Sequence, residues 1–164
     1  MQKVLIFIFL ITFQISIKAQ IWNAPNGIRE IPIPTLPDIA IASLDAIGPV
    51  IYYNPLGCQQ AGQYATAFFM AHEYGHHALG HILQRVFNSN NPYVQEWLNE
   101  NMENEADAYA VRYWINKGNK LVIQAGANFM WNINNNGDGT HPPSRVRANN
   151  YANLYLQITG TPLF

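Results

Sequence analysis

The sequence predicts an α+β fold, a mostly helical single domain with a short β-hairpin or small sheet ahead of its first long helix. This prediction depends on the order of the segments along the chain. Short runs rich in Ile, Val and Tyr come first, and long segments with apolar surface follow. No repeat or change in composition divides the chain, and 164 residues are enough to bury one hydrophobic core.

The first 20 residues have the pattern of a targeting segment. Lys3 supplies a positive start, residues 4–17 form an apolar run with three polar interruptions, and Ala19 is a small residue suited to cleavage. We therefore predict a signal peptide over residues 1–19, a folded domain over residues 20–164, and export to the periplasm or out of the cell. A retained membrane anchor is the alternative, but the run is short for a bilayer span and no second hydrophobic segment follows it.

Charge and cysteine content exclude several classes of function. The net charge is −1 and only 12% of the residues are charged, so the chain has no basic footprint for nucleic acid. Cys58 is the single cysteine, which excludes an internal disulfide. A free, partly buried thiol is favoured over a catalytic one, because the sequence identifies no activating partner for it.

The segment before the first long helix is expected to be extended. The prolines in residues 21–37 prevent this segment from forming a helix, and we expect it to lie along the domain surface. Ile39–Leu44 and Pro49–Tyr53 are predicted strands that together form a hairpin or sheet edge. Such an edge could hold an extended peptide by main-chain pairing.

Helices are predicted for the rest of the chain. The first spans Gln60–Val86, and close approach of a neighbouring segment would explain the glycines within it. Asn91 followed by Pro92 is typical of a helix start, and Gly118 of a helix end. A second helix is therefore predicted from Pro92 to about Asn116. A third helix is predicted over Lys120–Trp131, a polar loop over Asn132–Thr140, and a final helix from Pro142.

The first predicted helix carries a metal-binding pattern, His72-Glu73-Tyr74-Gly75-His76. Residues four apart lie on one face of a helix, so His72 and His76 can direct ring nitrogens at one ion. Glu73 lies about 100° further round the helix, where a general base can take a proton from a metal-activated water. His77 and His81 lie about 140° and 180° from His72, which favours structural or surface roles for both.

The second predicted helix carries Glu103 and Asp107, whose carboxylates share one face. A catalytic zinc ion takes three protein ligands and keeps one open position, so Glu103 is the candidate third ligand. Asp107 can accept a hydrogen bond from the far nitrogen of a zinc-bound histidine. Glu105 is a fallback ligand, but it points about 160° away from Glu103.

Together these motifs resemble the gluzincin metallopeptidases related to the CAAX prenyl protease and the heat-shock protease HtpX. The resemblance rests on His-Glu-x-x-His, on the later Glu-x-x-x-Asp, and on His141-Pro142-Pro143 with Arg147 six residues after His141. The spacing does not fit a metzincin, which would have a third histidine where Ile82 stands. The resemblance implies a zincin-like fold and one zinc ion held by His72, His76 and Glu103.

The resemblance also implies roles for the remaining motif residues. Glu73 would be the general base, His141 a hydrogen-bond donor near the reacting oxygen, and Arg147 a brace for an acidic group. The function predicted is an exported zinc metalloendopeptidase that acts on peptides or unfolded proteins and has no membrane span in its mature chain. The alternative is a non-catalytic exported protein that keeps the zincin fold to bind zinc or peptides.

Overall fold

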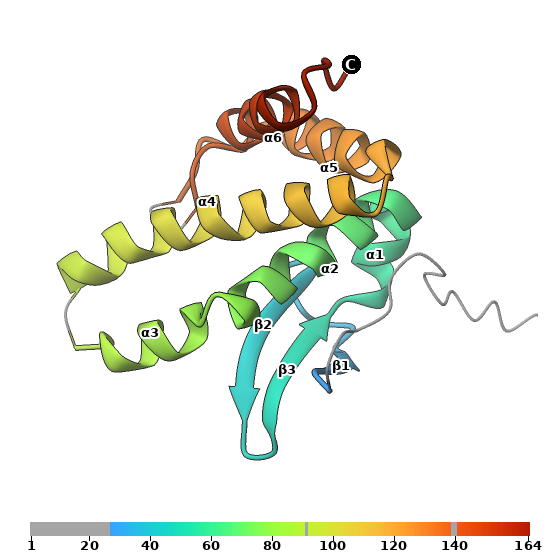
Figure 1. The fold of residues 1–164 in the computed structure, drawn as a ribbon. Coiled ribbons are helices and arrows are strands. Elements are labelled where there is room, and N and C mark those ends of the chain that lie inside the picture. Colours follow the sequence, from blue (N-terminus) through green and yellow to red (C-terminus); the bar gives the residue numbers. More distant parts are fainter. Residues whose placement is uncertain (1–26, 91, 139–140) are drawn as a thin grey trace, which may run out of the picture.

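The computed structural model describes residues 27–90, 92–138 and 141–164. The predicted signal peptide, residues 1–19, lies outside these ranges. The described chain has the predicted α+β architecture, mostly helical with one small sheet, in a single domain (Figure 1). None of its helices is long and apolar enough to cross a bilayer.

The predicted hairpin is confirmed, and a third strand joins it. Strands β2 (Ala40–Asp45) and β3 (Gly48–Tyr53) pair antiparallel, and β1 (Arg29–Pro32) pairs parallel to β3. The order β1-β3-β2 makes β2 an edge strand. We expected the segment that contains β1 to be only a surface extension. The prolines in this segment are compatible with a strand, because β1 is an edge strand and Pro32 is its last residue.

Six helices follow the sheet in the described chain. A short helix was missed in the sequence, although Asn54 followed by Pro55 is the same start signal that predicted the helix from Pro92. The Asn54 side chain accepts hydrogen bonds from the main chain of the first turn, at 3.0 and 3.1 Å. The helices are α1 (Pro55–Ala61), α2 (Gln63–Ala78), α3 (His81–Phe87), α4 (Pro92–Asn116), α5 (Lys120–Ile133) and α6 (Ser144–Thr159).

The predicted long helix over residues 60–86 is wrong, because it consists of parts of three helices. Gly62 has a φ of 80° and separates α1 from α2, while Gly80 has a φ of 73° and separates α2 from α3. Both glycines adopt the left-handed half of backbone space that other residues disfavour. The chain therefore changes direction directly before His81.

Helix α2 lies at the centre of the domain. The long helix α4 and helix α5 pack on it, α6 packs on α4 and α5, and β2 and β3 cover another face of it (Figure 1). Phe68 on α2 is fully buried, and its ring lies over Gly126 of α5, where a Cβ would be 2.5 Å from the ring. Other large core side chains come from strand β3 and from helices α4, α5 and α6: Ile51, Val111, Trp114, Ile123 and Tyr151.

Candidate metal centre and active site

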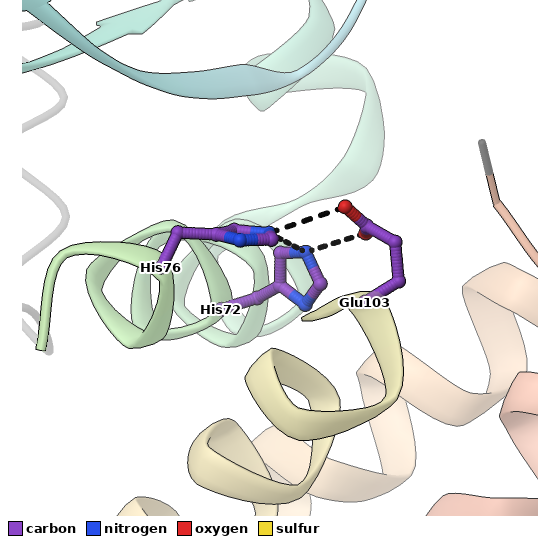
Figure 2. A group of neighbouring side chains, drawn as sticks. All are labelled: His72, His76 and Glu103. Carbon is purple, nitrogen blue, oxygen red and sulfur yellow. Dashed lines mark hydrogen bonds and ion pairs between the residues drawn. The ribbon is translucent and has the colours of Figure 1, made fainter. Parts of the chain in front are cut away.

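The side chains of His72, His76 and Glu103 converge between α2 and α4 (Figure 2). Nε2 of His72 lies 3.1 Å from Nε2 of His76 and 3.1 Å from Oε2 of Glu103, and Nε2 of His76 lies 3.3 Å from Oε1 of Glu103. All three side chains are buried, and one ligand atom of each lies within 4.8 Å of the others. This group could hold a metal ion.

A glycine lets the two helices approach closely enough to form the group. A Cβ at Gly75 would lie 3.1 Å from Cβ of Tyr109 and 3.2 Å from Cα of Ala106. Gly75 stands between the two histidines on α2, and Ala106 lies within one turn of Glu103 on α4. Because Gly75 has no side chain, α4 can pack closely against the face of α2 that carries the histidines, and this places Glu103 beside them.

Asp107 fixes the orientation of His72. Its Oδ1 atom lies 2.8 Å from Nδ1 of His72, the nitrogen that faces away from Glu103. Arg147 donates two hydrogen bonds of 2.7 Å to the same carboxylate, and the hydroxyl of Tyr151 donates a third of 2.9 Å. A carboxylate held from three sides sets the ring orientation of the histidine it contacts.

Glu73 lies at the edge of the group, between α2 and the sheet. Its Oε2 atom accepts a hydrogen bond of 2.7 Å from the backbone N–H of Ala42, on the edge strand β2. Its Oε1 atom lies 3.9 Å from Nε2 of His72. The edge strand thus holds one carboxylate oxygen and leaves the other beside the histidines.

A cavity of about 810 Å³ opens over these residues. Its lining includes residues 37–42, which contain the first half of β2, and the end of α5. His141 lies on its rim with a half-exposed side chain, and its Nε2 atom is 3.6 Å from Oε2 of Glu103. The apolar part of the lining includes Phe69, Phe129, Met130 and Ile133.

Residues 58–158 match the Peptidase U49 family, which is more than half of the chain. The chain belongs to this family. Membership makes the chain a peptidase with peptide or protein substrates, and the matched range contains every candidate site residue. Comparison with curated proteins and with solved structures gives no match. The match supports the peptidase class that the motifs predicted, without pointing to the CAAX prenyl protease or HtpX in particular.

In this U49 peptidase the ionisable groups of the site shift one another's pKa values strongly. Burial would lower the pKa of His72, but the Asp107 and Glu103 carboxylates outweigh it and raise the pKa to about 10. Burial lowers the pKa of His76 to about 4. Burial also opposes ionisation of Glu103, yet the two imidazoles hold its pKa well below the usual range. Glu103 is therefore an anion whose carboxylate faces two imidazoles, a set of donors that suits a metal cation.

Burial acts in the opposite direction on Glu73. Removal from water raises the pKa of Glu73 to about 7, against a smaller opposing effect of His72. A carboxyl whose pKa lies near neutral pH can both take up and release a proton there.

Sequence reasoning missed two contacts of the site. Arg85 on α3 donates a hydrogen bond of 2.9 Å to Oε1 of Glu103. His81, expected in a structural or surface role, is fully buried, and its Nδ1 atom lies 3.0 Å from Nδ1 of His76. The expectation assumed one unbroken helix, whereas the break at Gly80 returns His81 toward His76. The glycine itself was the available signal.

Two other residues lie away from the ligand group. His77 donates a hydrogen bond of 3.0 Å to the carbonyl of Val50 on β3. Glu105, the fallback ligand, points away from Glu103 as its position on the helix predicts, and its side chain is mostly exposed.

Proposed function

We propose that this U49 peptidase is a zinc-dependent metalloendopeptidase with a zincin-like fold. The convergence of His72, His76 and Glu103, with Glu73 beside them, is the observation that carries the proposal. Two imidazoles and one carboxylate are a common ligand set for catalytic zinc, which keeps a further position open. The order of the motifs, which resembles that of the gluzincins, supports the same assignment.

The donor set fits a metal ion. Oε2 of Glu103 is buried and has no hydrogen-bond partner among the described residues, although it faces Nε2 of His72. A buried acceptor without a partner is costly, and a cation at this point would satisfy it. Zinc bound there would act as a Lewis acid on the peptide carbonyl and lower the pKa of a water molecule to about 7.

Glu73 is the proposed general base. Its Oε1 atom takes a proton from the attacking water and then delivers it to the nitrogen of the leaving amine. The hydrogen bond from Ala42 holds the carboxylate in place during both transfers. His141, on the rim of the cavity, is the proposed hydrogen-bond donor to the oxygen of the reacting carbonyl.

The cavity suggests how a peptide binds. The N–H of Ala42 points away from β3 and is taken by Glu73. Because β2 is an edge strand, its other outward main-chain groups are the proposed partners of an extended peptide. The apolar end of the cavity, formed by α5 and Phe69, suits a large apolar side chain next to the scissile bond.

Export of the mature domain remains part of the proposal and rests on the pattern of residues 1–19. N-terminal sequencing of the exported product tests it. A product that begins at Gln20 agrees with cleavage after Ala19, whereas one that begins at Met1 contradicts it.

The variant Glu73→Gln tests the mechanism. It keeps the size of the side chain and the contact with Ala42 but removes the base. We expect zinc to bind with unchanged stoichiometry and kcat on unfolded protein substrates to fall about 10²- to 10⁴-fold. The matched control is Glu100→Gln, an exposed glutamate on α4, which should leave both unchanged.

Two outcomes would oppose the proposal. Turnover by Glu73→Gln at the rate of the parent would exclude Glu73 as the base. Stoichiometric zinc without hydrolysis of any of a broad set of peptides would favour the alternative, a non-catalytic binding protein.

A further inference from the structure

His81 and Glu105 form a chain of contacts that ends on His76. Nδ1 of His76 lies 3.0 Å from Nδ1 of His81, and Nε2 of His81 lies 2.9 Å from Oε2 of Glu105. The chain runs from the buried ligand group, through a fully buried imidazole, to a side chain that is 64% exposed.

The tautomers of the chain have one consistent assignment. If Nε2 of His76 faces a metal ion, its only ring proton is on Nδ1, which must donate. Nδ1 of His81 then accepts, so His81 carries its proton on Nε2 and donates it to the Glu105 carboxylate. Every donor meets an acceptor, and the negative end of the chain stabilises the proton on Nδ1 of His76.

The backbone is arranged to make this contact. On an unbroken helix, residues five apart point about 140° from each other, and the rings of His76 and His81 would not meet. The left-handed Gly80 ends α2, and His81 becomes the first residue of α3. The two rings then lie edge to face, with centroids 5.1 Å apart.

We propose that His81 and Glu105 are positioning residues for His76, as Asp107 and Arg147 are for His72. The inference rests on the proposed metal site. Each ligand histidine is then held at its far nitrogen, one by a carboxylate and the other by an imidazole with a carboxylate behind it. Loss of such a partner typically costs 10- to 100-fold in metal affinity.

The test compares zinc affinities, measured by competition with a chromophoric chelator. His81→Leu fills the space without an acceptor, and we expect its dissociation constant to rise about 10- to 100-fold. His81→Asn places an amide oxygen near the position of Nδ1, and we expect it to recover most of the lost affinity. Glu105→Gln keeps an acceptor without the charge and should have a smaller effect. The matched control is His77→Leu on α2, the helix that carries His76, and this variant should bind zinc as the parent does.

A spectroscopic signature separates this role from simple packing. In the zinc-loaded parent, we expect a scalar coupling across the hydrogen bond between the Nδ1 atoms of His76 and His81, observed by ¹⁵N NMR. Its absence would overturn the inference, as would equal zinc affinity of His81→Leu and the parent. Failure of the parent itself to bind zinc would instead overturn the proposed function on which the inference rests.

Discussion

Asp107 accepts hydrogen bonds from three buried side chains on two other helices. It meets His72, Arg147 and Tyr151, all buried, and together they connect α2 and α4 to α6. Burial would raise the pKa of Asp107, but the Arg147 guanidinium outweighs it and lowers the pKa to about 2. Asp107 and Arg147 thus form a buried ion pair, in which each charge depends on the other.

The variant Arg147→Met leaves the Asp107 carboxylate buried without its main cation. We expect the metal-free protein to lose about 3–5 kcal/mol of unfolding free energy, because an uncompensated buried charge remains. Urea unfolding in the presence of a chelator measures this loss. Arg112→Met, at an exposed position on α4, is the matched control and should change the stability by less than about 0.5 kcal/mol. A loss below about 1 kcal/mol for Arg147→Met would show that the pair is not structurally important.

The sequence predicts some contacts between individual residues of the site and not others. His72, Glu73 and His76 lie within two helical turns, so their relative positions follow from helix geometry alone. Glu103 is 27 residues beyond His76. Its place in the site was predicted from the need of a catalytic zinc ion for a third protein ligand. Arg85 and His81 could not be placed, because both follow a break in the helix whose angle the sequence does not specify.

Among the helices, the crossing of α2 and α4 decides whether the ligand group can form. Gly62, Gly75 and Gly80 were all expected to allow a neighbour to approach, but only Gly75 does so. The other two have positive φ and no atom within 4 Å of an added Cβ, so they serve as helix boundaries. A glycine in a sequence does not reveal which of these uses it has, because both depend on backbone geometry.

The variant Gly75→Ala tests the importance of the crossing. An added methyl group would press on Cα of Ala106, a backbone atom that can move only with its helix. We expect a loss of about 1–3 kcal/mol of stability from overpacking, and weaker zinc binding as Glu103 moves away from the histidines. Thermal unfolding and a zinc titration measure the two effects.

Gly57→Ala is the control for this substitution. Its Cβ would meet Asn54 at 3.4 Å, an ordinary contact, and α1 carries no site residue. We expect little change in zinc affinity and a small gain in stability, because alanine favours a helix. Equal zinc binding by Gly75→Ala and the parent would show that the close approach of the helices is not needed for the site.

Across the whole molecule, a bound ion would act as a cross-link. His72 and His76 belong to the central helix α2, whereas Glu103 belongs to α4, which in turn contacts α5 and α6. The three ligands come together only in the folded chain, so the ion binds the native state far more tightly than the unfolded one. Zinc should therefore raise the stability of the entire domain and not only order the site.

We accordingly expect chelation of zinc to lower the melting temperature. At free zinc 1,000-fold above the dissociation constant, binding adds about 4 kcal/mol, which for a domain of this size corresponds to a shift on the order of 10 °C. Differential scanning calorimetry with and without chelator measures it. Glu73→Gln should show the full shift because Glu73 is not a proposed ligand, while Glu103→Gln should show little of it. The same melting temperature for the parent with and without chelator would mean that no ion joins α2 to α4.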